Sequence, residues 1–144
     1  MGITGTFEGY VPTVTDLYLR GNNIRNLVRA GNNNRFKLAF ESGQITASFA
    51  GMSGYIATDT AQNLTGHNGI ACEGYSLTDS TIRMSVNTQN GVYCQDEEEA
   101  SADTNVETNK SFVAKLNISA INASRYIHIG SVNAVVYVYR VWFY

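Results

Sequence analysis

Two histidines and two cysteines are the residues of this chain best suited to metal or nucleophilic chemistry. His67, in the segment NLTGHNG, precedes Cys72 by five residues, and this pair resembles half of a metal site. His128 and Cys94 would have to complete it, but these separations match no zinc-binding spacing. The spacing leaves open whether Cys72 and Cys94 form a disulfide or stay reduced. We expect no metal, no cofactor and no catalytic nucleophile.

The acidic segment CQDEEEASADTNVE, residues 94 to 107, suggests a second kind of site. Asp96, Glu98, Asp103 and Asn105 carry the oxygen ligands that calcium prefers, but they lack the ordered spacing of a calcium loop. A solvated surface loop and an acidic patch facing a partner are the alternatives. No HExxH, GxSxG, phosphate loop or dinucleotide fingerprint occurs, so we expect a protein that is not an enzyme.

Aromatic side chains offer the remaining chemistry, because the chain has nine tyrosines, six phenylalanines and one tryptophan. Tyrosine and tryptophan rings could stack on sugar rings, with asparagine and aspartate as hydrogen-bonding neighbours. The candidate glycan contacts are Tyr93, Tyr126 and Trp142, with Tyr137 and Tyr139 as further candidates. Packing in a hydrophobic core is the competing explanation for such residues. A carbohydrate-binding module is therefore the alternative function.

The elements that position these residues are predicted to be strands, because apolar residues recur with a period of two. In residues 112 to 118, Phe112, Ala114, Leu116 and Ile118 share one face. Residues 36–40, 45–49 and 82–86 alternate in the same way, and ESGQ at 41–44 predicts a hairpin over residues 35–50. We expect one all-β domain over residues 1–144, a jelly-roll-like antiparallel β-sandwich of about eight to ten strands, with a small barrel as the nearest alternative.

The C-terminal segment AVVYVYRVWFY breaks this alternation, because strict alternation puts large groups on both faces. It would place Tyr137 and Phe143 on one face, and Arg140 and Trp142 on the other. Such a strand is either central in a sheet or covered by a partner. On the second reading the chain forms a homo-oligomer, and the predicted contact residues are Tyr137, Tyr139, Arg140, Trp142, Phe143 and Tyr144.

A near repeat with a ten-residue offset lies in LYLRGNNIRNLVRAGNNNRF, residues 17 to 36. We interpret it as two strand-turn units whose arginines line one edge. Arg20, Arg25 and Arg29 could then dock on the acidic residues Glu97 and Glu98 of another copy. Asparagine and glycine dilute the arginines, and the net charge is −2, so we expect no nucleic-acid partner.

Residues 15 to 36, TDLYLRGNNIRNLVRAGNNNRF, resemble the short strand-turn units of bacteriophage virion proteins, such as capsid accessory proteins and head or tail fibres. The resemblance implies a non-enzymatic structural or attachment protein that docks on other virion proteins and carries over no catalytic position. The N-terminus MGITGTFEGY shows no signal peptide, and no run is long enough to span a membrane. We therefore expect a protein that is made in the host cytoplasm and resides in the virion, with no membrane partner.

Overall fold

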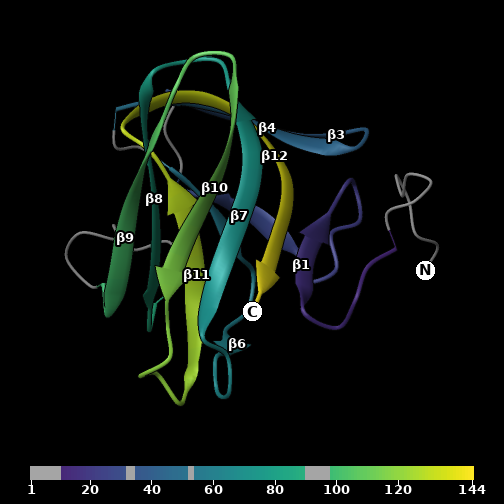
Figure 1. The fold of residues 1–144 in the computed structure, drawn as a ribbon, viewed down its shortest axis with the longest axis vertical. Helices are drawn as coiled ribbons and strands as arrows, with labels where there is room; N and C mark the ends of the chain where they lie inside the picture. The colour runs from purple at the N-terminus through teal and green to yellow at the C-terminus, as the bar shows by residue number, and fades with distance from the viewer. Residues whose placement is uncertain (1–10, 32–34, 52–53, 90–97) are drawn as a thin grey trace.

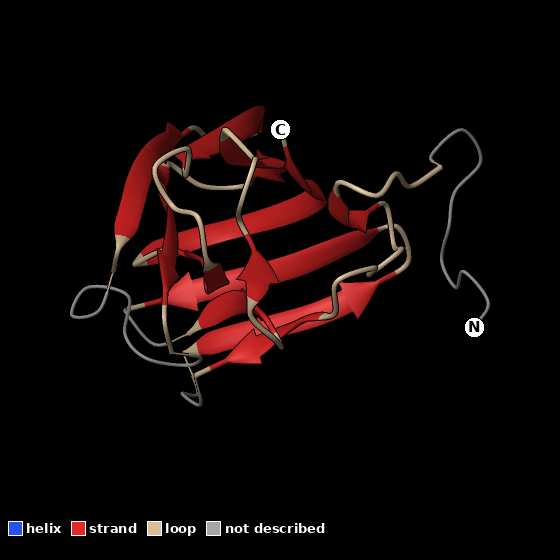
Figure 2. Ribbon diagram, turned by 90° about the horizontal axis from the view of Figure 1, so that it is seen from below, coloured by secondary structure: helices blue, strands red, loops and turns tan. Residues whose placement is uncertain are grey.

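The computed structural model describes residues 11–31, 35–51, 54–89 and 98–144. Within these ranges the chain consists of strands joined by loops, and Figure 2 shows no helix among them. No helix in this part of the chain could therefore cross a membrane. Tyr93, Cys94, Asp96 and Glu97 lie outside the described residues, so their predicted roles stay predictions.

The described chain forms twelve strands, slightly more than expected. They are β1 (Asp16–Leu19), β2 (Leu27–Ala30), β3 (Phe36–Glu41), β4 (Gln44–Ala50), β5 (Tyr55–Thr58), β6 (Gln62–Asn63), β7 (Gly69–Ser76), β8 (Ser80–Asn87), β9 (Ala100–Val106), β10 (Lys110–Asn117), β11 (Ser124–Gly130) and β12 (Asn133–Phe143). The extra strands are short ones such as β6, which the period of two does not reveal because two residues hold no alternation.

The strands form two antiparallel sheets that stack as a sandwich, as the sequence predicts (Figure 1). Sheet A has the order β10-β7-β12-β4-β3, with β1 also paired to β12. Sheet B has the order β2-β5-β11-β8-β9, with β6 also paired to β11. Many spatial neighbours are distant in sequence, so the chain crosses repeatedly between the two layers.

The predicted alternation matches the observed burial in β4 and β10, whereas in β3 Phe36 is buried but Phe40, predicted on the same face, is exposed. In β10 and the residue after it, Phe112, Ala114, Leu116 and Ile118 are buried. The hairpin predicted over residues 35–50 is formed by β3 and β4, which pair from Phe36↔Phe49 to Glu41↔Gln44. Its turn uses Gly43 at φ +82°, a conformation that glycine adopts without steric cost.

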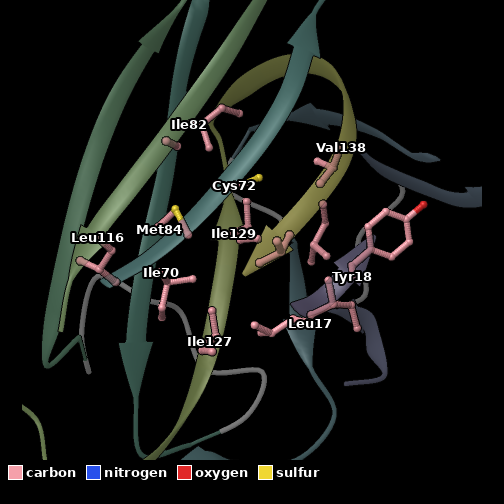
Figure 3. Close-up of a cluster of buried hydrophobic side chains, with 14 of the residues drawn as sticks. Leu17, Tyr18, Ile70, Cys72, Ile82, Met84, Leu116, Ile127, Ile129 and Val138 are labelled. Carbon is pink, nitrogen blue, oxygen red and sulfur yellow. The ribbon is translucent and has the colours of Figure 1, made fainter. Parts of the chain in front are cut away.

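The core fills the space between the two sheets. Figure 3 shows side chains from β7, β8, β11 and β12 pointing toward one another there. Ile70, Met84, Ile127 and Val138 are among its fully buried members. Burying a side chain of this size contributes about 1.5–3 kcal/mol relative to leaving it exposed, so these contacts are the main stabilisation of the sandwich.

The C-terminal strand β12 is central, because it lies between β7 and β4 in sheet A. Its predicted division into faces was wrong. The register with β7 shifts between Val138 and Arg140, which marks a β-bulge. Beyond the extra residue, the side chains that strict alternation assigns to one side of the sheet lie on the other. Val138 and Val141 therefore both face the core. Phe143 is likewise buried, while Trp142 is only partly buried.

The repeat of glycines and asparagines does not build one edge, and that prediction was wrong. β1 pairs with β12 in sheet A, whereas β2 pairs with β5 in sheet B. Two copies of one strand-turn pattern thus enter different layers, because hydrophobic pairing partners decide the sheet and local turn residues do not. Arg20 consequently lies in the turn that follows β1 of sheet A, whereas Arg29 lies in β2 of sheet B.

Candidate functional site

The outer side of sheet A, turned away from the core, carries a row of aromatic residues on β12 and its neighbour β7. Strands β7 and β12 run side by side in Figure 1. We define the aromatic face as Tyr75, Tyr137, Tyr139, Trp142 and Tyr144. These residues are partly buried or exposed, and the sandwich formed by the described residues has no third layer over them.

Tyr75 and Tyr137 form the centre of the aromatic face. They are direct cross-strand partners, with ring centroids 6.4 Å apart and an angle of 19° between the ring planes. Their outer neighbours in the same row are Ser111 on β10 and Thr46 on β4, both bearing hydroxyl groups. The row thus places a stacked aromatic pair between two hydrogen-bonding side chains.

Trp142 lies farther along β12 and is held by a charged neighbour. The guanidinium carbon of Arg140 is 4.3 Å from the centroid of the Trp142 ring. Arg140 also donates a hydrogen bond from Nε to Asp16 Oδ1 at 2.8 Å. Asp16 is buried, and its other carboxylate oxygen accepts a hydrogen bond from the backbone N–H of Thr13 at 2.9 Å. This ion pair fixes the guanidinium over the indole.

Tyr144 extends the pairing of β12 with β7 by one residue. Its backbone N–H donates to Gly69 O at 2.9 Å, and its carbonyl accepts from the backbone N–H of Gly69 at 3.1 Å. A Cβ at position 69 would lie 2.2 Å from Cζ of Tyr144, so the missing side chain lets this ring lie over the β7 backbone. Lys115 Nζ lies 5.5 Å from the centroid of the Tyr144 ring.

Tyr139 is the residue inserted at the bulge. The guanidinium carbon of Arg20 lies 4.1 Å from the centroid of its ring, and the backbone N–H of Arg20 donates to Tyr139 O at 2.8 Å. Arg20 and Gly21 have φ values of +44° and +95°, and Leu19 pairs with Asn22, so these two residues form a tight turn. A non-glycine residue with positive φ is uncommon, and here the turn directs Arg20 onto the aromatic face.

The arrangement offers side chains that can bind a ligand. Aromatic rings offer apolar area, and hydroxyl and cationic groups beside them supply directed hydrogen bonds. Among the described residues no three histidine, cysteine, aspartate or glutamate side chains gather as a metal site. Burial raises the pKa of the Cys72 thiol to about 12, so this thiol stays protonated inside the core.

The structure separates the predicted glycan contacts. Trp142 lies on the outer side of sheet A, whereas Tyr126 lies on β11 in sheet B, opposite Asn87 of β8. Sequence reasoning missed Tyr75. The signal was present, because Ile70 and Cys72 alternate with Glu73 and Tyr75 in β7, which puts Tyr75 on the polar side.

The predicted electrostatic contacts are also dispersed. Arg25 donates to Val14 O at 3.0 Å, and Arg29 donates to Phe36 O at 2.6 Å with its guanidinium carbon 4.8 Å from the Phe36 ring centroid. In the acidic segment, Glu98 accepts a hydrogen bond from Arg83 Nε at 2.8 Å.

Two further acids of this segment are paired within the chain as well, Asp103 with Arg83 and Glu99 with Arg125. The acids that were candidates for calcium or for a partner therefore already have arginine partners, as far as the structure describes them.

A polar cluster on the outer side of sheet B stands apart from the aromatic face. His128 and Ser85 are cross-strand partners, and Asn87 follows on the same side of β8. All three are fully buried. Both ring nitrogens of His128, Ser85 Oγ and Asn87 Nδ2 have no hydrogen-bond partner among the described residues. Burial lowers the pKa of His128 to about 4, while the nearby Glu98 opposes this shift, so the imidazole is neutral at pH 7.

Comparisons with known proteins find solved structures with a similar fold but no match to the amino-acid sequence. No family model matches the chain, and no curated protein matches its sequence.

Several solved structures share the fold. CBM4 superposes with a TM-score of 0.57 and 10% identity, covering 99% of this chain and 100% of that one. A family 6 carbohydrate-binding module from Clostridium cellulolyticum in complex with xylose gives 0.52 and 12%, covering 82% and 97%. An exo-beta-1,3-galactanase from Phanerochaete chrysosporium gives 0.54 and 18%, covering 93% of this chain but only 30% of the enzyme. At these identities the likeness establishes the β-sandwich fold that carbohydrate-binding modules also have.

Proposed function

We propose that this chain is a non-catalytic carbohydrate-binding β-sandwich that holds a glycan on its aromatic face. One observation carries the proposal: five aromatic residues gather on the outer side of two adjacent strands, away from the core. A sandwich that needed these rings only for stability would bury them, because buried area supplies the stabilisation. Rings left at the surface are available to a ligand.

The shape of the face suits an extended glycan. Tyr137 is opposite Tyr75 and Tyr144 is opposite Gly69, so at roughly 3.3 Å per residue of β7 the row is about 20 Å long and can contact several sugar units. The hydroxyl of Ser111 flanks the tyrosine pair on one side; that of Thr46, on the other, donates to Glu41 Oε2 at 2.8 Å and can still accept a hydrogen bond from a sugar. Support also comes from the fold, since the similar modules include one solved with xylose bound.

A glycan array probed with the whole chain tests this function. Xylo-, cello- and beta-1,3-galacto-oligosaccharides are suitable first probes. The variant Tyr137→Ala should weaken binding by about tenfold through lost stacking, whereas Tyr126→Ala, a partly buried tyrosine on the other sheet, should bind like the parent. Equal loss in both variants, with both still folded, would contradict a site on the aromatic face.

The virion role remains a separate prediction that the similar structures do not support. In that case a second copy or another virion protein would cover the aromatic face, since exposed apolar area of this kind also suits protein contacts. Native mass measurement distinguishes the two readings. A stable oligomer that dissociates in Tyr137→Ala and shows no glycan signal would favour the assembly reading.

A further inference from the structure

We propose that the aromatic face selects an anionic glycan, one whose sugar units carry carboxylates. This inference rests on the proposed glycan-binding function and adds the charge of the ligand. Its basis is that three cationic side chains lie at this face, each against one of its rings. The pairs are Arg20 with Tyr139, Arg140 with Trp142, and Lys115 with Tyr144.

Arg140 has hydrogen-bonding capacity left for such a ligand. Its Nε donates to Asp16, and within the described chain its two terminal nitrogens, Nη1 and Nη2, have no hydrogen-bond partner. A guanidinium presents its donors as a planar fork that matches a carboxylate in a two-bond contact. Because Asp16 and Trp142 already fix the group, little conformational entropy is lost when it binds an anion.

Lys115 lies on the same side of the sheet and approaches the site from β10. In register, Lys115 is opposite Ala71, and Ala71 is opposite Trp142, so two strand spacings or about 10 Å separate the two backbones. The side chain between them is a single buried methyl group. No described ion pair engages Lys115, and its ammonium group can therefore face a ligand that lies over Trp142 and Tyr144.

The carboxylates near the aromatic face belong to Asp16, Glu73 and Glu41. Asp16 is buried and already bonded to Arg140 and Thr13, so it offers little charge to the surface. Glu41 lies beside the Thr46 end of the row, where it accepts a hydrogen bond from Thr46 Oγ1 at 2.8 Å. Glu73 is opposite Arg140 in register, yet no ion pair joins them among the described contacts. An anionic sugar beside these rings would gain charge-assisted hydrogen bonds from the cations, whereas a neutral sugar would gain only ordinary ones.

Titration calorimetry with a matched pair of ligands tests the charge directly. The probes are tetragalacturonate and its methyl ester, which keeps the rings and removes the charge. We expect the parent chain to bind the acid at least roughly tenfold more tightly than the ester, because charge-assisted hydrogen bonds are lost. Raising the salt concentration should weaken only the acid. A sulfated oligosaccharide in a third arm shows whether the site recognises the geometry of a carboxylate or only its negative charge.

Three substitutions locate the effect. Lys115→Met keeps the length of the side chain and should weaken acid binding roughly fivefold, a larger loss than for the ester. Glu73→Gln removes the opposing charge and should strengthen acid binding roughly two- to threefold. Arg140→Lys keeps a cation near Asp16 but loses the planar fork, and it should weaken the carboxylate ligand more than the sulfated one.

The possible results distinguish the preference for an anionic glycan from the glycan-binding function on which it rests. Equal affinity for acid and ester overturns the charge preference and leaves glycan binding intact. Tighter binding of the sulfated probe than of the acid, unchanged in Arg140→Lys, overturns the carboxylate assignment. Binding of none of these probes, nor of the neutral oligosaccharides, contradicts the carbohydrate function itself.

Discussion

Arg140 Nε donates a hydrogen bond to Asp16 Oδ1 at 2.8 Å, which joins residues that are 124 positions apart in the chain. The contact links β12 to the short strand β1. The Asp16 side chain is only 1% exposed, whereas that of Arg140 is 33% exposed. The bond therefore neutralises a buried carboxylate and at the same time holds a cation at the surface beside Trp142.

Replacing Arg140 by methionine should destabilise the fold, because it leaves the buried carboxylate of Asp16 without its cation. We expect a loss of about 2–4 kcal/mol in the free energy of unfolding, measured by urea denaturation. The double variant Asp16→Asn with Arg140→Met should recover part of this loss. If the single variant were as stable as the parent, the ion pair would not compensate a buried charge.

Acid should destabilise the protein through His128. The folded-state pKa of about 4 lies below the ordinary value of 6.5, so between these values the unfolded chain binds a proton that the folded chain does not. The contribution of this histidine to stability is present above pH 6.5 and is lost as pH falls toward 4, by about 3 kcal/mol. The slope of melting temperature against pH measures it.

The variant His128→Leu isolates that effect, since leucine cannot be protonated. Its melting temperature should change less between pH 6.5 and 4 than that of the parent. His67→Gln is the matched control, because His67 is the other histidine of the chain. Its ring stacks on that of Phe143, with the ring centroids 4.4 Å apart, and not on the His128 cluster. Should His128→Leu keep the full acid slope, another group is responsible.

Two glycines of β7 should respond differently to alanine. A Cβ at Gly74 would lie 2.2 Å from the backbone oxygen of Tyr137, which cannot move without disturbing the ladder. A Cβ at Gly69 would meet the ring of Tyr144, a side chain at the surface that can rotate. We expect Gly74→Ala to cost about 3 kcal/mol of stability. Gly69→Ala should cost much less stability but weaken glycan binding, and thermal melts together with calorimetry compare the two.

The sequence predicts most of the fold, because alternation records which side of a strand is buried. The strand ending near Ile118 was predicted from this signal alone, and the hairpin at residues 35–50 from this signal together with the turn residues ESGQ at 41–44. The faces of β12 were not predicted correctly, since the bulge at Tyr139 inserts one residue and leaves no mark in a run made mostly of aromatic and β-branched residues. The assignment of β1 and β2 to different sheets depends on long-range pairing, which a local repeat does not encode.

The candidate site was predicted only in part. Trp142, Tyr137 and Tyr139 were named from residue type, and they do gather on one face. Tyr126 was named on the same grounds and lies on the other sheet, because residue type carries no information on which layer a strand joins. Tyr75 and Lys115 join the site through the register of β7 with β12 and β10, and register is fixed by the folded sheet.

The fluorescence of Trp142 offers the most direct test, because the chain contains one tryptophan and it lies on the aromatic face. Titrating the parent chain with a glycan that binds on the array should change the tryptophan emission at the same concentration that saturates binding. Tyr126→Ala should give the same curve, and Tyr137→Ala should shift it to roughly tenfold higher ligand concentration. Saturable glycan binding that leaves the Trp142 emission unchanged and is unaffected by Tyr137→Ala would contradict a binding site on this face.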